Sequence, residues 1–405
     1  KKELDMKVLH VASFNGNIGD YANHSGFRRC MKHYVNSKIE YTNLEIREFY
    51  KSWNMRKFDD NFVSIANQFD LLIFGGGNFF EMCWDYSSTG TTIDIPEEIL
   101  NKIKCPILFN GLGIDDKNGA INRDNIKKFG RFLKVITSSD QYFVTVRNDG
   151  SLKIAEKYFE NSIIQCIHKI PDGGFFVSPK EYIHLEIPDK YKIIGINLAG
   201  DAPKVRFSET GSDGRITQEQ FIEELTQYID TVLSLYQDIF ITFIPHIGKD
   251  LELISKVLGK VKDNILRTRI SVAPYLNGTI TDGNYIFDLY RKCILTIGMR
   301  YHSNVCSIAV NTPTIGIVNL PKHKMLYEDI GMQDRLVISD EPDLGSRLLE
   351  KTKRSLSDLD NMKKENRQLL ERLTLENEKY FKNINLFLNK NIGHTRGETY
   401  EQNSI

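Results

Sequence analysis

Short β-rich runs alternate with longer amphipathic segments along this chain, and that alternation restricts the fold more than any other feature. Apolar, β-branched runs bounded by Gly, Pro or charge are expected to form strands, and in the first half they are 8–14, 39–46, 71–74, 107–110 and 143–146. Residues 21–34 carry the apolar spacing of a helix. Strands that alternate with helices predict βαβ units and a parallel sheet with helices on both faces.

A second series of the same kind begins after Pro179. Its candidate strands are 193–198, 239–244, 270–273, 294–297 and 314–318, with helical spacing over 218–236 and 251–261. The stretch 178–191 has two prolines and many charges and is typical of a linker. The sequence therefore predicts an α/β protein of two Rossmann-like domains, residues 1–180 and 190–340, facing each other across a cleft.

The remaining residues, 341–405, are highly charged, with leucines recurring near helical spacing. They are expected to form C-terminal helices that pack back over the domains and a polar tail that is frayed from about Gly393. A coiled-coil surface for a partner is the alternative interpretation of the leucine spacing.

Composition narrows the class of protein. The 405 residues include 53 Lys and Arg and 53 Asp and Glu, and a formal charge of zero argues against nucleic acid or an anionic membrane as the main partner. No apolar run approaches the roughly 18 residues that span a bilayer, and the first residues lack a long secretory core. The six cysteines are scattered without a CxxC pair, which favours reduced thiols over disulfides or a zinc site. We expect a cytoplasmic globular protein.

Three glycine-containing turns follow candidate strands. The segment 15–20, Asn-Gly-Asn-Ile-Gly-Asp, precedes a helix that Asn17 or Asp20 can cap, and a plain structural turn is the alternative to a ligand loop. Gly75-Gly-Gly77 with Asn78 and Gly111-Leu-Gly113 follow later strands and leave room for a ligand against backbone N–H groups. Neither of these two later loops is a P-loop, because no GK[ST] follows.

Basic residues follow two further strands. Arg147 ends the run 143–146 and can bind a carboxylate or phosphate with its guanidinium fork, a surface salt bridge being the alternative. In Ile297-Gly-Met-Arg-Tyr-His302-Ser303, Arg300 and His302 stand at the start of a helix, whose N-terminus favours an anionic ligand. His302 can act as acid or base near neutral pH, or merely cap the helix. His246 follows the strand 239–244 and is a second-tier binding candidate.

Metal and hydrolase chemistry have little support in the sequence. The only DxD motif, Asp358-Leu-Asp360, lies in the charged C-terminal segment, where a solvated helix face explains it. No GxSxG motif supplies a nucleophile. We expect neither a metal site nor a cofactor.

Several short motifs occur in an order that resembles the polysaccharide pyruvyl transferase family. In chain order they are Asn17-Ile-Gly-Asp20, Gly75-Gly-Gly77, Gly111-Leu-Gly113, Arg147 with Ser151, Asp172 in Pro-Asp-Gly-Gly, Gly298-Met-Arg-Tyr-His302, Pro313-Thr-Ile-Gly316 and the Lys322/Lys324 region before Leu326-Tyr-Glu-Asp-Ile-Gly331. The sequence departs from the family pattern at Asn148, where a carboxylate often follows the arginine, and at the Asn319-Leu-Pro insertion. The resemblance covers residues 8–331.

The resemblance implies a fold like that of the GT-B glycosyltransferases. It also implies transfer of a pyruvyl ketal group from phosphoenolpyruvate to two hydroxyls of a sugar in a polysaccharide or its lipid-linked precursor, with release of phosphate. A lipid-linked acceptor would bring the enzyme to the inner membrane face. His302 is the expected acid and base, and Arg300 acts beside it.

The resemblance also divides the candidate residues between the two substrates. The residues expected to bind the donor are Arg147, His246, Arg300, His302 and Ser303. Those expected on the acceptor side are Asn17, Gly19, Asp20, Gly75, Gly76, Gly77 and Asn78. The aromatic side chains of Phe79, Phe80 and Trp84 are candidates for stacking on a sugar or for the core.

Two other functions stay open from the sequence. A glycosyltransferase of the same fold that uses a nucleotide sugar would also need glycine loops and a basic residue, but the carboxylate it needs near the ribose has no secure position here. A non-catalytic glycan- or nucleotide-binding protein would leave the pairing of Arg300 with His302 unexplained.

Overall fold

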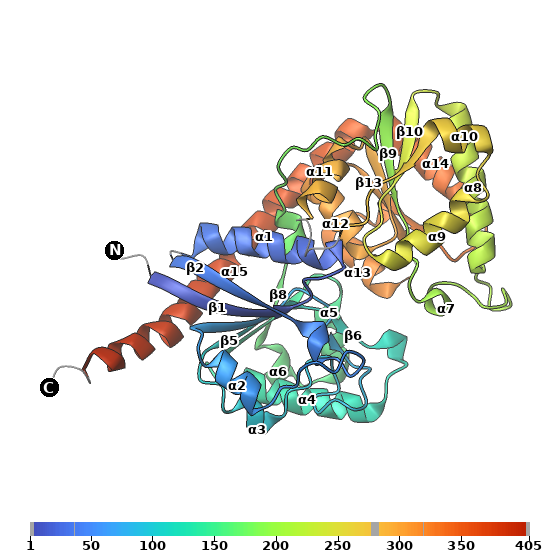
Figure 1. Ribbon diagram of the computed structural model, residues 1–405. Helices are drawn as coiled ribbons and strands as arrows, with labels where there is room; N and C mark the ends of the chain where they lie inside the picture. The colour runs from blue at the N-terminus through green and yellow to red at the C-terminus, as the bar shows by residue number, and fades with distance from the viewer. Residues whose placement is uncertain (1–3, 36, 277–282, 319, 402–405) are drawn as a thin grey trace. The chain divides into compact units, whose positions relative to one another are not determined.

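The computed structural model describes residues 4–35, 37–276, 283–318 and 320–401 (Figure 1). Their contacts divide the chain into two compact units. Unit 1 takes the described residues of 1–14, 23–173 and 373–405, and unit 2 takes those of 15–22 and 174–372. Each unit is an α/β structure built on its own sheet, as the sequence predicted.

The main sheet of unit 1 is parallel throughout, with strand order β2-β1-β3-β5-β7-β8. Its strands are β1 (Leu4–Ala12), β2 (Ser37–Glu45), β3 (Leu71–Gly75), β5 (Ile107–Leu112), β7 (Tyr142–Arg147) and β8 (Ile167–Ile170). Every residue of β3 and β5 is buried, which agrees with their apolar sequence and with a parallel sheet covered on both faces. The strand order reverses between β1 and β3, and ligands of open α/β sheets bind at such a point, beside the carboxyl ends of the strands.

Helices and two short strands complete unit 1. They are α1 (Ile18–Tyr34, whose first turn lies in unit 2), η1 (Ile46–Phe49), α2 (Asp60–Ala66), β4 (Phe80–Glu81), α3 (Glu97–Leu100), β6 (Ile114–Asp115), η2 (Lys117–Gly119), α4 (Arg123–Thr137), α5 (Ser151–Tyr158) and α6 (Asn161–Ile164). Asp59 and Asn122 start α2 and α4 by accepting backbone N–H groups of the first turn. The apolar face of α4, with Phe129 and Leu133, packs into the core of the unit.

The sheet of unit 2 has the order β11-β10-β9-β12-β13-β14 and is also parallel. Its strands are β9 (Lys192–Asn197), β10 (Ile239–Phe243), β11 (Ile270–Val272), β12 (Leu295–Gly298), β13 (Thr314–Val318) and β14 (Leu336–Ile338). Around it lie η3 (Gly173–Phe176), α7 (Pro203–Arg206), α8 (Gln218–Leu235), α9 (Gly248–Leu258), α10 (Asp263–Arg269), α11 (Asn284–Lys292), α12 (Tyr301–Ala309), α13 (Pro321–Ile330), η4 (Gln333–Arg335) and α14 (Leu344–Ser357). The order reverses between β9 and β12.

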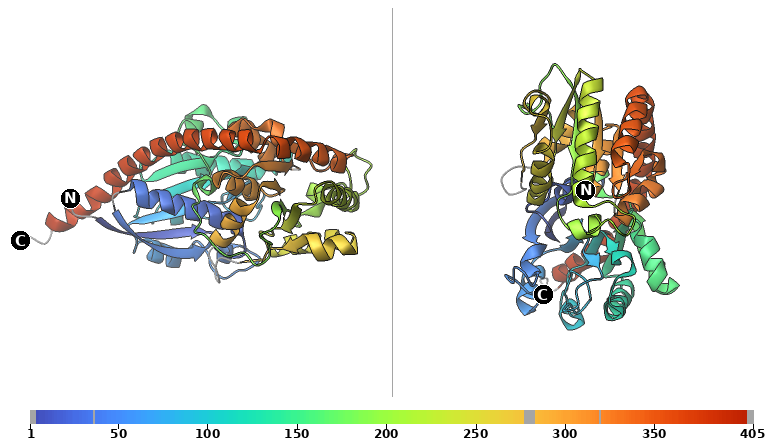
Figure 2. Two further views of the ribbon diagram at one scale, coloured as in Figure 1. Left: turned by 90° about the horizontal axis from the view of Figure 1, so that it is seen from above. Right: turned by 90° about the vertical axis from the view of Figure 1, so that its right-hand side faces the viewer.

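The C-terminal segment forms two helices, α14 and α15 (Leu359–Glu401). Helix α14 lies beside α8 (Figure 2), where the Tyr228 hydroxyl is 2.9 Å from the Thr352 hydroxyl. Within unit 1, the Tyr380 hydroxyl of α15 donates to Asn110 Oδ1 at 2.6 Å. These contacts agree with helices that pack back on the domains. The backbone of α15 stays helical to Glu401, whereas the sequence predicted a frayed end from about Gly393.

The units differ from the predicted domain division at three points. Residues 15–22 belong to unit 2, although they follow the first strand of unit 1. The predicted linker 178–191 also belongs to unit 2, where the Asp288 carboxylate of α11 accepts the Tyr182 N–H at 2.8 Å and lies 2.9 Å from His184 Nε2. The predicted C-terminal segment, 341–405, is shared, with 341–372 in unit 2 and the described residues from 373 onward in unit 1.

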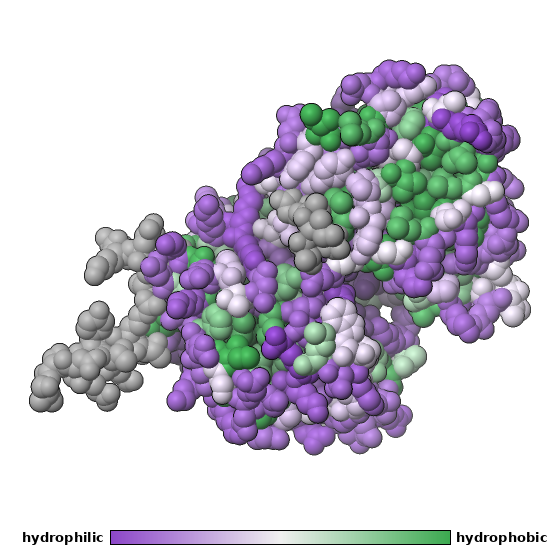
Figure 3. All heavy atoms as spheres, viewed as in Figure 1, coloured by the Kyte–Doolittle hydropathy of each residue, from purple (hydrophilic) through white to green (hydrophobic). Residues whose placement is uncertain are grey.

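Across the described residues, we find no helix with the length and apolar character needed to cross a membrane. The face seen in Figure 3 is mainly hydrophilic, with apolar groups set among polar ones.

Candidate functional site

Arg300 lies at the strand-order reversal of unit 2, directly after β12 and before the first turn of α12. Its Nη2 is 2.5 Å from Asp250 Oδ1 and 2.7 Å from Asp201 Oδ1, and its Nε donates to Asp250 Oδ2 at 2.8 Å. Burial alone would lower the pKa of Arg300, but the two carboxylates outweigh it and raise that pKa. The guanidinium is therefore charged and already held by two carboxylates.

Asp250 organises this end of the sheet, and the sequence analysis did not identify it. Its side chain is fully buried and, besides Arg300, accepts the backbone N–H groups of Gly200, His246 and Ile247 at 2.9–3.1 Å. A Cβ atom at Gly200 would lie 1.9 Å from the Lys249 carbonyl oxygen, so only glycine lets this loop approach α9. The available signal was an aspartate in the first turn of a helix that follows a buried strand.

Asp201 is the more accessible partner of Arg300. Its side chain is 40% exposed, whereas that of Asp250 is buried. Burial would raise the pKa of Asp201, but the charges of Arg300 and Arg206 hold that pKa below its ordinary value. Arg206 also donates to Asp201 Oδ1, at 3.1 Å.

His302 occupies the first turn of α12 and is 7% exposed. Gly19 packs against its ring, because a Cβ atom at Gly19 would lie 2.6 Å from His302 Nδ1. Next to it, the Ser303 hydroxyl donates to the Arg300 carbonyl at 2.7 Å, so that this hydroxyl bonds within the turn itself.

The loop 15–20 lies with the candidate donor residues of unit 2, whereas the sequence placed it on the acceptor side of the first domain. Asn17 Oδ1 accepts the Gly19 N–H at 2.9 Å, and Asn17 Nδ2 donates to Asp20 Oδ2 at 3.0 Å. The Ile18 N–H donates to the His246 carbonyl at 3.2 Å. Residues far apart in the sequence therefore meet around His302 and His246.

His246 is fully buried below this loop. Its Nε2 is 2.6 Å from the Tyr290 hydroxyl, and its Nδ1 is a buried atom without a hydrogen bond. Burial, assisted by the positive charges of Arg300 and His302 and opposed by Asp250, lowers the pKa of His246 to about 3. The imidazole is therefore neutral at physiological pH.

Arg147 lies in unit 1, at the carboxyl end of β7, and its side chain is 4% exposed. Its Nε donates to Asp149 Oδ2 at 2.5 Å, and its Nη1 is 3.7 Å from Asp172 Oδ2. Asp172 also accepts from Asn23 Nδ2 at 2.9 Å, and Asp149 accepts the Ser151 N–H at 3.2 Å. Arg147 thus forms a salt bridge, as in the alternative interpretation, but a buried one.

The glycines 75–77 allow close packing. A Cβ atom would lie 3.0 Å from His10 Nε2 at Gly75, 2.4 Å from Asn23 Oδ1 at Gly76 and 2.4 Å from the Phe79 ring at Gly77. Gly76 also has a φ of +75°, which glycine adopts without strain. Each glycine therefore has a packing reason that is independent of a ligand.

The residues after this loop differ in their surroundings: Asn78 makes hydrogen bonds, and the aromatic residues differ in burial. Asn78 Nδ2 donates to Asp115 Oδ2 at 3.2 Å and to Glu81 Oε2 at 3.5 Å. Phe79 and Phe80 are buried in the core of unit 1, while Trp84 is half-buried. Of the three aromatic candidates for stacking on a sugar, only Trp84 is partly accessible.

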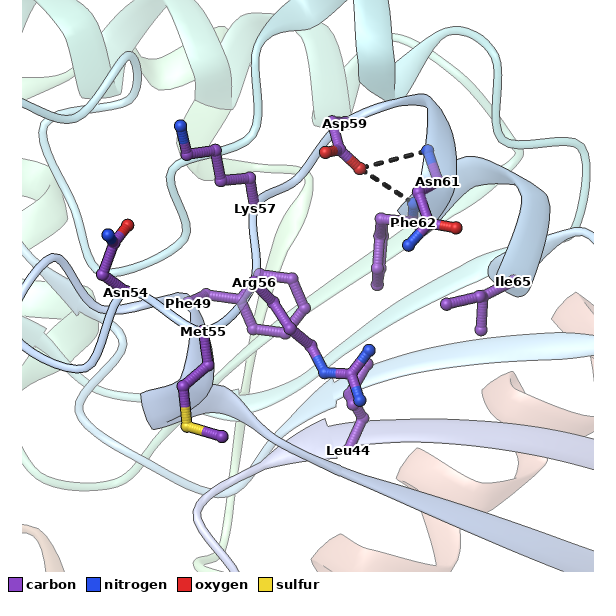
Figure 4. Close-up of a pocket in the computed structure, with 10 residues that line it drawn as sticks. All are labelled: Leu44, Phe49, Asn54, Met55, Arg56, Lys57, Asp59, Asn61, Phe62 and Ile65. Carbon is purple, nitrogen blue, oxygen red and sulfur yellow. Dashed lines mark hydrogen bonds between the residues drawn. The ribbon is translucent and has the colours of Figure 1, made fainter.

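A cavity of about 280 Å³ in unit 1 lies apart from the residues singled out by the sequence (Figure 4). It combines an apolar floor, including Phe49 and Phe62, with the polar side chains of Arg56, Lys57 and Asp59. In the described parts of the chain, no three His, Cys, Asp or Glu side chains group together as metal ligands would.

Two Rossmann-like units define the class as a GT-B-like α/β fold, and solved structures share it. The structure of an Anabaena protein, HepE, in complex with UDP and glucose has a TM-score of 0.50 and 10% identity, and the match covers 97% of this chain and 100% of that one. A protein from Listeria monocytogenes assigned as a UDP-N-acetylglucosamine 2-epimerase has a TM-score of 0.51 and 10% identity, with 91% of each chain covered. At such identity the likeness establishes the fold alone.

The family is established by sequence. Residues 17–321 match the family model for polysaccharide pyruvyl transferase, and the chain therefore belongs to that family. Membership makes it a transferase enzyme. A comparison with curated proteins found no match.

Proposed function

We propose that this enzyme transfers the carboxyethylidene group of phosphoenolpyruvate to two hydroxyls of a sugar in a polysaccharide or its lipid-linked precursor, with release of phosphate. The observation that carries the proposal is the position of His302 and Arg300 at the N-terminus of α12, within a chain that belongs to this family. An imidazole beside a guanidinium and a helix N-terminus suits a small anion that must also be protonated.

In the proposed reaction, the His302 imidazolium donates its proton to C3 of the enol ether. C2 then has oxocarbenium character and is attacked by a sugar hydroxyl, which loses its proton. Phosphate leaves from C2, and the second hydroxyl attacks the same carbon and loses its proton to close the ketal. One hydroxyl proton returns to His302 and the other leaves with the phosphate. A C3–H bond, two C–O bonds to the sugar and one O–H bond on phosphate thus replace the π bond of the enol, the C–O bond to phosphate and two hydroxyl O–H bonds, so atoms and charge balance.

Arg300 is proposed to hold the negative charge of the donor. Asp250 is fixed by five N–H groups, whereas Asp201 is 40% exposed and is the partner that a carboxylate or phosphate of the donor can replace. The fork of the guanidinium then binds one oxygen of Asp250 and one oxygen of the donor. Ser303 and His246 support this site by their positions, and Arg147 remains a candidate donor contact in unit 1.

The acceptor side of the proposal rests on Gly75, Gly76, Gly77 and Asn78, with Asn17, Gly19 and Asp20 reassigned to the surroundings of His302 by their contacts. Since phosphoenolpyruvate is made in the cytoplasm, the proposal places the reaction there, at the inner membrane face if the acceptor is lipid-linked.

The proposed chemistry needs no cofactor and no divalent metal. Turnover that is unchanged by EDTA would agree, and activity lost in EDTA and restored by Mg²⁺ would contradict it.

The experiment that tests the donor is a thermal shift with phosphoenolpyruvate against a panel of nucleotide sugars. A ligand that binds only the folded state raises the melting temperature by mass action. Stabilisation by phosphoenolpyruvate, together with phosphate release when a sugar acceptor is added, is the expected result. Stabilisation by a nucleotide sugar instead would favour a glycosyltransferase, which the fold also accommodates.

A further inference from the structure

Four aromatic side chains lie on two neighbouring segments of unit 1, and we call them the aromatic patch: Tyr50, Trp53, Trp84 and Tyr86. The Trp84 ring centroid is 5.8 Å from that of Tyr50 and 5.7 Å from that of Tyr86. Trp53 follows on the turn that Tyr50 begins, where its N–H donates to the Tyr50 carbonyl at 3.1 Å. Trp53 is 47% exposed and Tyr86 43% exposed, so large ring surfaces face solvent.

Exposed aromatic rings grouped in this way mark a binding surface more often than a packing accident. A pyranose ring presents a face of C–H groups, and this face packs well on the negative face of an aromatic ring. Tyr and Trp add a polar tip that bonds hydroxyl groups.

Polar groups around the patch match the hydroxyls of a sugar. Glu81 Oε1 accepts the Trp84 indole N–H at 3.2 Å, and Asp85 accepts from Asn125 Nδ2 at 2.7 Å. Lys51 Nζ lies 5.5 Å from the centre of the Tyr86 ring. Carboxylates, amides and an ammonium in one place suit a neutral polyhydroxylated ligand, whereas an anionic membrane would favour cations without carboxylates.

The patch is also continuous with the loop proposed for the acceptor. Asn78 and Trp84 both donate to the Glu81 carboxylate, from the two sides of strand β4 in the sequence. The loop 75–78 follows β3 at the strand-order reversal of the unit 1 sheet. Glu81 therefore connects the loop to the Trp84 ring, so a glycan bound at the loop would also reach that ring.

We infer that the aromatic patch is a glycan-binding platform that holds a pyranose ring of the acceptor oligosaccharide. This inference rests on the proposed function for the acceptor, but glycan binding here can be measured without the donor. It assigns Tyr50, Trp53 and Tyr86 to substrate binding together with Trp84.

Tryptophan fluorescence provides a direct readout, because the chain has two tryptophans and both belong to the patch. The full chain is titrated with cellohexaose, mannohexaose and chitohexaose without phosphoenolpyruvate. We expect at least one of them to give a saturable change in emission. In Tyr86→Ala the affinity should fall about tenfold through lost apolar contact, and in Tyr86→Phe, which keeps the ring but loses the hydroxyl, it should fall by less.

A matched control and a second probe complete the test. Leu235→Ala removes a 53% exposed side chain from unit 2 and should leave the titration unchanged. The inference is overturned if no hexaose changes the emission, if Tyr86→Ala titrates like the wild type, or if phosphatidylglycerol vesicles alone shift the emission. A missing thermal shift with phosphoenolpyruvate would instead count against the proposed donor and leave glycan binding standing.

Discussion

His302 is the residue with the clearest expected effect on turnover. If its imidazole protonates C3 of the donor, His302→Ala should lower kcat by about 10²–10⁴. His302→Gln should do the same, because an amide fills much of the space but transfers no proton. The thermal shift with phosphoenolpyruvate should persist in both variants, since the charge of Arg300 remains.

The control for this prediction is His33→Ala, which removes an exposed imidazole from the last turn of α1. Turnover at the wild-type rate in a folded His302→Ala variant would make His302 a helix cap or an anion contact.

Arg300 should show its role in donor binding. Arg300→Lys keeps the charge but replaces a fork that spans Asp250 and Asp201 with a single ammonium. We expect the affinity for phosphoenolpyruvate to fall by about tenfold or more, with turnover reduced as well. Arg215→Lys, at a surface pair with Asp213, is the matched control for donor titrations. Equal affinities in the two variants would limit Arg300 to a structural ion pair.

Asp250 should matter for stability before it matters for binding. Asp250→Asn removes the charge opposite Arg300 and places an amide NH2, a donor, where a carboxylate oxygen accepted N–H groups, so the free energy of unfolding should fall by about 3–5 kcal/mol. Asp213→Asn changes a carboxylate that is 46% exposed and should be nearly neutral in chemical denaturation. A loss in Asp250→Asn no larger than in this control would mean that the N–H groups find other acceptors.

At the residue scale, the sequence could single out candidates at a junction of elements but not residues whose role depends on tertiary packing. Arg300 and His302 stood out because basic residues at a strand–helix turn are recognisable in sequence. Asp250 did not, since an acidic residue in the first turn is ordinary for any helix. Its partners come from the loops after β9 and β12, and only the tertiary fold brings them together.

At the scale of elements, apolar periodicity predicted each of the strands in the centre of both sheets. In these two sheets, the strands that the sequence analysis missed are short or mixed in burial: β8 has two exposed residues among four, and β14 has three residues. In β8, His168 and Lys169 interrupt the apolar residues, and β14 is an apolar run of only three residues, so neither resembles a central parallel strand.

The sequence did not show which residues surround the glycine loop 75–77 and the charged segment 178–191 in the folded protein. Gly75–Gly77 looked like space for a ligand, but the space that their missing Cβ atoms leave is occupied by His10 of β1, by Asn23 and His24 of α1, and by Phe79. The segment 178–191 looked like a free linker, but Asp288 of α11 holds it through Tyr182 and His184. Apart from Phe79, the residues that make these contacts lie about 50 or more positions away in the sequence, so no local pattern could reveal them.

At the scale of the whole molecule, each unit holds an arginine between two carboxylates at the carboxyl edge of its sheet, fully buried for Arg147 and partly buried for Arg300. Arg147 lies between Asp149 and Asp172, and Arg300 between Asp250 and Asp201. Breaking such a pair is costly, because the remaining charge stays buried. The same edge of unit 2 also holds a buried neutral histidine, which makes its folding sensitive to acid.

His246 predicts how the stability of unit 2 depends on pH. Its pKa is about 3 in the folded protein, whereas an unfolded histidine titrates near 6.5. Below pH ~6.5 the unfolded chain therefore binds a proton that the folded unit does not, and stability falls as the pH drops toward about 3. The expected contribution is about 1.4 kcal/mol per pH unit within this window.

Hydrogen exchange of the β10 amides from pH 7.5 to 4.5, corrected for intrinsic rates, measures this slope in unit 2 itself. In His246→Asn the slope should decrease by about one proton, even if the lost contact with Tyr290 lowers stability at every pH. In His33→Asn, where the imidazole is exposed, the slope should stay as in the wild type. The assignment would be wrong if His246→Asn kept the full slope, and the acid sensitivity of β10 would then belong to other groups of unit 2.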